Sequence, residues 1–172
     1  MARIGSKPQT PFRGTSAIFG TLIEDHDEHR RILAALSETR GQSTVRQDLF
    51  AEMTYALKGH AAAEEQAVWS TVLRKPEITE QGRHAVAEHK EIDDMLNALA
   101  ATSMASGVWL VRFNALREEY LHHIREEEQE LFIAIDKHLT ADDRLYMDSV
   151  FKRRKLAETS AAEITPRMKA VH

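Results

Sequence analysis

The stretch HAAAEEQAVW, residues 60–69, is matched by HIREEEQELF, residues 123–132. In both, two glutamates stand four and five residues after a histidine, and glutamine and an apolar–aromatic pair follow. DHDEHRRIL at 25–33 and EHKEIDDML at 88–96 also match, sharing an acid, a histidine and a closing leucine. His60 and His123 are 63 residues apart, and so are His26 and His89. Two matches at one offset indicate a duplicated helical hairpin.

The residues around these motifs predict long helices. Prolines occur only at positions 8, 11, 76 and 166, and the stretches between them are rich in Ala, Leu, Glu, Arg and Lys, which favour helix. Capping residues predict helices from Thr15 or Ser16 to Gly41, Ser43 to Arg74, Thr79 to Ser103, Gly107 to His138, and Thr140 to Ala161. We therefore expect an all-α, up-down-up-down antiparallel four-helix bundle with a short fifth C-terminal helix. The expected organisation is a flexible N-terminal arm (1–14), the bundle with its fifth helix (15–162) and a flexible tail (163–172).

The composition excludes several classes of protein. The chain has 172 residues, of which 42% are hydrophobic and 29% charged, as expected of a soluble globular domain. It has no apolar run long enough to span a membrane and no secretory signal, so we expect a cytoplasmic location. The absence of cysteine excludes disulfides and thiol chemistry, and the net charge of -4 argues against general nucleic-acid binding. The basic run 152–155 is either a solvated face or a docking surface for an unknown acidic protein partner or a membrane surface.

The repeated histidines and glutamates predict a metal site. In H-x-x-x-E the two side chains share one helical face, so duplication places one histidine on each helix and two glutamates at the same level. Such groups facing a core are costly unless they are paired or bind metal. Imidazole and carboxylate ligands suit iron, manganese or zinc. The alternative is a metal-free bundle in which these residues are solvated or paired. The candidate metal ligands are His26, His60, Glu64, His89, His123 and Glu127.

These motifs resemble those of the hemerythrin-like (HHE cation-binding) family, over about residues 16 to 139. The resemblance implies two iron ions with an oxo or hydroxo bridge, and bridging carboxylates from Glu64 and Glu127. It assigns His26 and His60 to one iron, and His89 and His123 to the other. One coordination position then stays free for dioxygen, hydrogen peroxide, nitric oxide or azide. Tyr120, one turn before His123, is a candidate hydrogen-bond donor to a bound ligand.

His84 is a candidate seventh ligand. Oxygen-carrying hemerythrins have a further histidine four residues before the one on the third helix, but here that position is Ala85 and His84 lies five residues before His89. A π-bulge between them would align both rings, whereas a straight helix leaves His84 on the surface. Without a third histidine both irons stay accessible, which favours redox chemistry. Relatives that repair iron centres after nitrosative stress typically carry a cysteine-containing segment, which this chain lacks.

The expected function is therefore that of a di-iron protein which binds or reduces a small oxidant, with catalase-like turnover as a possible activity. The alternatives are a sensor of oxygen, redox state or iron, and an iron-buffering module without turnover. Among other residues near the motifs, we expect acids and histidines on the surface and Trp69 and Phe132 at the hydrophobic end of the site. The alternative for the acids is a position behind the ligands, where they orient the ligand rings. The acids are Asp25, Glu65, Glu88 and Glu128, and the histidines are His29, His122 and His138.

Overall fold

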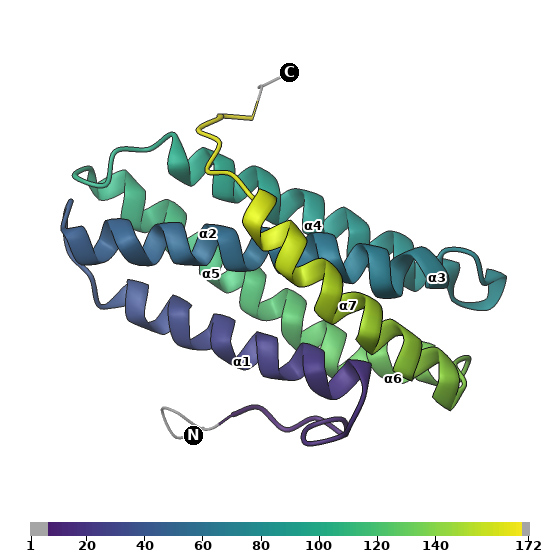
Figure 1. The fold of residues 1–172 in the computed structure, drawn as a ribbon. Helices are drawn as coiled ribbons and strands as arrows, with labels where there is room; N and C mark the ends of the chain where they lie inside the picture. The colour runs from purple at the N-terminus through teal and green to yellow at the C-terminus, as the bar shows by residue number, and fades with distance from the viewer. Residues whose placement is uncertain (1–6, 170–172) are drawn as a thin grey trace.

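The computed structural model describes residues 7–169 and confirms a bundle of helices, with no strand in that range. The long helices α1, α2, α4 and α5 lie lengthwise beside one another, and α7 crosses obliquely over α2 (Figure 1). The elements are α1 (Ile18–Ser37), α2 (Thr44–Glu64), η1 (Glu65–Trp69), α3 (Ser70–Val72), η2 (Pro76–Ile78), α4 (Thr79–Ala100), α5 (Gly107–Glu126), η3 (Glu127–Leu131), α6 (Phe132–Asp136) and α7 (Ala141–Ala161). The second and fourth long helices thus continue through η1 and α3, and through η3 and α6.

Most helix starts follow the predicted caps. The Ser43 side chain accepts a hydrogen bond from the backbone N–H of Arg46, and Thr140 forms a capping box with Asp143. Two starts differ from prediction. Helix α1 begins at Ile18 rather than at Thr15 or Ser16. Thr79 is the first residue of α4 but does not cap it, because its hydroxyl donates to the carbonyl of Lys75 instead.

The start of α1 is displaced because the preceding turn folds back onto the helix. A Cβ atom at Gly20 would lie 1.9 Å from the carbonyl oxygen of Thr15, so only glycine fits there. The turn also places Ala17 at a φ of 71°, which is a left-handed conformation that alanine rarely adopts. Helix α1 can therefore begin only after this residue.

The hydrophobic core forms two clusters, one at each end of the bundle. One contains Trp69, Phe132 and Phe151, and the other contains Trp109 and Phe113. On α1, α2 and α4, the histidine of the predicted site lies between the residues of the two clusters, and on α5 His123 lies beside Ile124, where the second cluster ends on that helix. The metal-ligand candidates thus form a polar layer between two apolar layers.

The backbone widens into a π-helix at two equivalent places. The π-helical segment η1 begins at Glu65, one residue after Glu64, and η3 begins at Glu127 itself; each spans five residues. Helix α4 is α-helical throughout, so no π-bulge lies between His84 and His89. The duplication therefore includes the backbone irregularity as well as the side chains.

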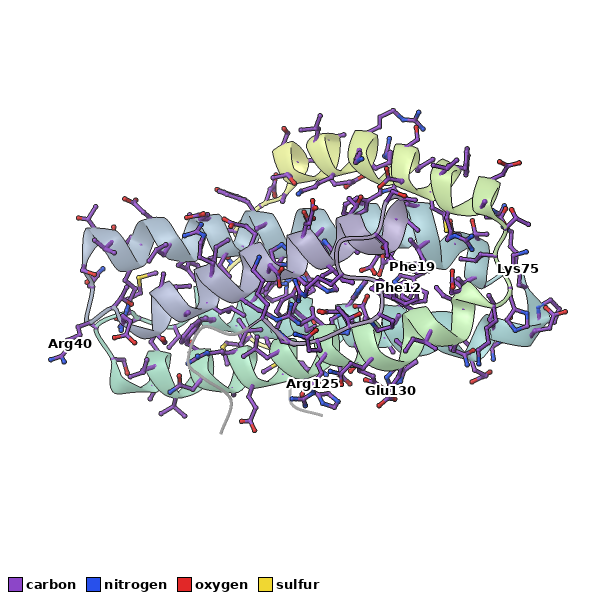
Figure 2. All side chains as sticks on the ribbon, turned by 90° about the horizontal axis from the view of Figure 1, so that it is seen from below. Phe12, Phe19, Arg40, Lys75, Arg125 and Glu130 are labelled. Atoms are coloured by element: carbon purple, nitrogen blue, oxygen red, sulfur yellow. The ribbon has the colours of Figure 1, made fainter. Side chains whose placement is uncertain are left out.

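Segments outside the helices also contact the bundle, although residues 1–6 and 170–172 of the predicted arms lie outside the described range. The ring of Phe12 lies 4.7 Å from that of Phe19 between centroids (Figure 2), and Arg13 pairs with Asp27. At the other end of the chain, the backbone N–H of Arg167 donates to the carbonyl of Asn97. Within residues 7–169, no helix combines the length and apolar character needed to cross a membrane.

Candidate metal centre

The six predicted ligands meet in the polar layer of the bundle. His26, Glu64 and Glu127 are fully buried, and His60, His89 and His123 are at most 6% exposed. The imidazole rings form two pairs, with centroids 5.1 Å apart for His26 and His60 and 5.0 Å apart for His89 and His123. These are the two pairs that the resemblance assigned to separate metals.

The two glutamates lie between the imidazole rings. Glu64 Oε2 is 3.3 Å from His60 Nε2 and 3.5 Å from His89 Nε2, so this carboxylate reaches one histidine of each pair. Glu127 Oε1 is 3.8 Å from His89 Nε2 and contacts His123 Nε2. A carboxylate placed between two groups of imidazoles is positioned to bridge two cations.

The inner atoms of this layer lack hydrogen-bond partners. Among the described residues, the Nε2 atoms of His26, His60 and His89 and all four carboxylate oxygens of Glu64 and Glu127 are buried and make no hydrogen bond. Leaving so many buried polar atoms unsatisfied would cost about 1–3 kcal/mol for each of them. Metal coordination satisfies all of them, and nitrogen and carboxylate oxygen are ligands that fit iron, manganese or zinc. The residues present therefore fit a pair of metal ions.

Each of the four histidines is held from outside by a carboxylate. The Nδ1 atoms of His60, His26, His123 and His89 lie 3.0, 3.0, 3.0 and 3.2 Å from Asp25, Glu128, Glu88 and Glu65 respectively. Because a carboxylate only accepts hydrogen bonds, Nδ1 carries the proton, and the lone pair of the neutral ring lies on Nε2, facing the centre. The carboxylates thus fix the tautomer that a metal requires.

The four carboxylates correct the expectation that these acids are surface residues. Asp25, Glu88 and Glu128 are at most 9% exposed, and only Glu65 keeps a side chain that is substantially exposed, at 40%. A surface position was expected because an acid next to a ligand on a regular helix points about 100° away from it. The alternative, that the acids orient the ligand rings, is the arrangement found here. The signal was present in the repeat, since Asp25 and Glu88, like Glu65 and Glu128, occupy equivalent positions.

His29 is a further buried histidine that was expected on the surface. It lies three residues after His26 and therefore on the same side of α1, a spacing that could have predicted its burial. Its Nδ1 is 2.6 Å from the hydroxyl oxygen of Tyr120, and its ring meets that of His60 edge-on at 5.0 Å between centroids. Ligand atoms of Asp25, His29 and His60 also lie within 4.8 Å of one another. Tyr120 thus contacts the centre through His29.

Burial and neighbouring charges shift the pKa values of the cluster. Burial lowers the pKa of His60, but the neighbouring carboxylates of Asp25 and Glu64 outweigh it and raise that pKa to about 9. The pKa of His123 is likewise raised to about 9 against the effect of burial, through Glu127 and Glu88. Without metal, these imidazoles are therefore protonated at neutral pH and balance the glutamates. Metal binding must displace those protons.

His29 and Tyr120 are shifted in the opposite sense, toward their neutral forms. Burial lowers the pKa of His29 well below its usual value, and the neighbouring imidazoles of His60 and His26 lower it further. Burial also raises the pKa of Tyr120 well above its usual range, as do the charges of Glu127 and Glu64. The pair is thus an uncharged imidazole hydrogen-bonded to an uncharged phenol.

His84 lies apart from the six residues. Its side chain is 47% exposed, and its Nε2 is 3.0 Å from Glu126 and 3.2 Å from Glu88, rather than among the inner atoms. The α-helical backbone of α4 accounts for this, because five residues separate His84 from His89 without a π-turn.

Helix α7 reaches the centre with one residue of its basic run. Lys155 Nζ donates to Asp25 at 2.5 Å, on the carboxylate that holds His60, and the ring of Phe151 lies edge-on to His60. Lys152 and Arg154 pair with Asp148 and Glu158 on α7 itself. Three of the four basic side chains of residues 152–155 are therefore engaged within the chain.

A pocket of about 310 Å³ opens beside the centre. It is lined by His60, His89 and His123, by Tyr120, and by apolar residues of α2 and α4 that include Ala62 and Val86. A small molecule in this pocket would be next to three of the four histidines. The fully buried His26 does not line it.

Comparisons with known proteins agree with this geometry. Residues 17–135 match the hemerythrin HHE cation binding domain. An uncharacterized hemerythrin-like protein of Schizosaccharomyces pombe is 28% identical over 109 residues, which is 60% of this chain and 52% of that protein, so the chain spans about half the length of this relative. A similar solved structure is the crystal structure of a hemerythrin HHE cation binding domain-containing protein from Mycobacterium kansasii. It superposes on this chain with a TM-score of 0.76 at 20% identity, and the match covers 86% of this chain and 90% of the other. The two proteins therefore share a fold. The chain belongs to the hemerythrin HHE cation-binding family.

Proposed function

We propose that the chain is a non-haem di-iron protein that binds or reduces a small oxidant, namely dioxygen, hydrogen peroxide or nitric oxide. The observation that carries this proposal is the set of buried imidazole nitrogens and carboxylate oxygens that converge without hydrogen-bond partners. A single ion would leave part of this set unsatisfied, whereas two ions bridged by Glu64 and Glu127 would use all of it.

The six residues have distinct parts in this proposal. His26 and His60 would hold one iron, His89 and His123 the other, and the two glutamates would bridge them. His29 is not assigned as a ligand, because neither of its ring nitrogens is among the buried atoms that lack a hydrogen-bond partner. When bound, two irons supply electrons to an oxidant at a free coordination position. The outer carboxylates keep each Nε2 lone pair directed inward, and the apolar layers on both sides exclude water.

The pocket and the Tyr120–His29 pair would support chemistry on a small ligand. The pocket gives a molecule of two or three atoms a route to the histidines between α2 and α4. Tyr120 lines that pocket, and its hydroxyl is hydrogen-bonded to Nδ1 of the neutral His29 imidazole, which fixes the direction of the hydroxyl. The pair is therefore placed to hold one proton beside the centre.

A sensor is a second candidate function, favoured by the position of α7. Lys155 connects this helix to Asp25 and, through it, to His60. A change of metal state that altered the charge on His60 would act on this contact. Oxidation-dependent protease cleavage within α7, without turnover of oxidant, would support the sensor over the redox protein.

The test is to purify the protein without added metal, measure metal per chain, and record the visible spectrum with and without azide and hydrogen peroxide. We expect about two irons per chain and near-ultraviolet bands that shift with azide, as an open position on a bridged pair requires. Consumption of peroxide would identify a redox enzyme, and its absence a binder or sensor. Stoichiometric zinc, or a spectrum that azide does not change, would refute the proposal.

A further inference from the structure

A second group of histidines and glutamates lies on the surface beside the buried centre. His84 and Glu88 are four residues apart on α4, and His122 and Glu126 are four apart on α5. Both pairs thus repeat the H-x-x-x-E spacing of the buried site, on two neighbouring helices and turned toward the surface. None of the four is assigned as a ligand in the proposed di-iron centre.

Three of the four side chains converge, and His122 lies beside them. His84 Nε2 is 3.0 Å from Glu126 Oε1 and 3.2 Å from Glu88 Oε1, and His122 Nε2 is 3.7 Å from Glu126 Oε2. Ligand atoms of His84, Glu88 and Glu126 all lie within 4.8 Å of one another. Glu126 Oε2 is buried and makes no hydrogen bond among the described residues. The cluster therefore has an open acceptor where an ion would sit.

The composition of the cluster favours a divalent cation. Two carboxylates give two negative charges, and the two imidazoles add nitrogen ligands that carry no charge when they coordinate a metal. Two nitrogens and two carboxylate oxygens form a ligand set that suits Fe²⁺, Mn²⁺ or Zn²⁺. The glutamate side chains are only 11% and 19% exposed, which limits competition by water, whereas both histidines are about half exposed and can admit an ion from solvent.

We propose that His84, Glu88, His122 and Glu126 bind one divalent first-row transition-metal ion at the surface, separate from the buried centre. Glu88 Oε1 is also 3.0 Å from Nδ1 of His123. One carboxylate is therefore shared between the surface site and a ligand of the proposed di-iron centre. Metal bound at the surface draws charge from the carboxylate that holds His123, so the two sites are coupled through Glu88.

The test titrates Co²⁺ into tag-free protein that retains its own buried metal, with equilibrium dialysis and visible absorption as readouts. We expect one additional Co²⁺ per chain with ligand-field bands. H84A and E126Q should each weaken this binding by more than about tenfold, since even the loss of an outer partner costs about 10–100-fold. H138A is the matched control, because His138 is an exposed histidine outside the cluster and its loss should not change Co²⁺ binding.

The outcomes separate this proposal from the di-iron one. If the buried centre carries no metal, Co²⁺ binds there as well as at the surface cluster. H84A then loses the Co²⁺ bound at the surface cluster, whereas H60A loses the Co²⁺ bound at the buried centre. Circular dichroism of H84A and E126Q checks that both fold, and H122A gives a third, independent variant. If wild-type protein binds no additional Co²⁺, or if H84A and E126Q bind it as the wild type does, the cluster is only a set of ion pairs and the proposal is wrong.

Discussion

Replacing Asp25 by asparagine tests whether the outer carboxylates control metal affinity. Asp25 accepts hydrogen bonds from His60 Nδ1 at 3.0 Å and from Lys155 Nζ at 2.5 Å. Asparagine keeps the shape of the side chain but removes the charge that fixes the tautomer of His60 and makes it a stronger ligand. Loss of such a partner lowers metal affinity by about 10–100-fold, which is about 1.4–2.7 kcal/mol. Because Asp25 contacts one of the four histidines, only one of the two metals should be weakened.

The assay is competition between the protein and a chelator for Fe²⁺ without oxygen, which resolves a tight and a weakened metal in D25N. Asp27 provides the matched control on the same helix, since it pairs with Arg13 and Arg30 instead of a histidine. D27N should keep the wild-type affinity for both metals. Wild-type affinity in D25N, or an equal loss in D27N, would refute the reasoning.

Three further predictions concern pH, packing and access. In metal-stripped protein the raised pKa of His60 stabilises the fold fully below pH 6.5, and this stabilisation is lost as pH rises through about 9. At about 1.4 kcal/mol per pH unit, the loss amounts to up to about 3 kcal/mol. The free energy of unfolding in urea should therefore be lower at pH 10 than at pH 6. Gly59→Ala should destabilise the protein by about 1–3 kcal/mol in thermal unfolding, because its Cβ would lie 2.8 Å from the backbone of Thr159 on α7, whereas Gly107→Ala, with open space around it, should not. Ala62→Phe should lower the rate of azide binding, measured by stopped-flow absorption, by about tenfold without changing the metal content. The phenylalanine ring would fill the pocket, so that azide could enter only after this side chain moves.

The sequence predicted the fold well because its signals are local. Prolines, the caps at Ser43 and Thr140, and a strong helix-forming composition define the helices, and the stripes of Leu22, Leu33 and Leu116 are buried as expected. The start of α1 was placed too early. The close approach of Thr15 to Gly20 that delays it depends on the positive φ of Ala17 between them, a conformation that capping patterns do not predict for alanine.

The inner residues of the site were predictable, and the outer ones were not. Repetition at one offset identified the six inner residues, because a duplicated motif stands out against single histidines and glutamates. An acid such as Glu128 is repeated at the same offset, as Glu65, but this repetition alone does not indicate burial, since exposed acids are common on helices. Its burial depends on Arg30 and His26 from another helix, and on the π-turn at Glu127–Leu131, which changes the direction of side chains after Glu127.

The four carboxylate–histidine bonds have a consequence for how the chain folds. They join α1 to α2, α2 through η1 to α4, α4 to α5, and α5 through η3 back to α1, so they form a closed circuit around the bundle. The bonds within each hairpin link residues 35 apart, whereas the bond from His26 to Glu128 spans 102 residues. Closing a longer loop costs more chain entropy, so each hairpin can form its own bond before the circuit closes. A complete set of oriented histidines then exists only after the first and last long helices have met, which makes assembly of the centre a late step of folding.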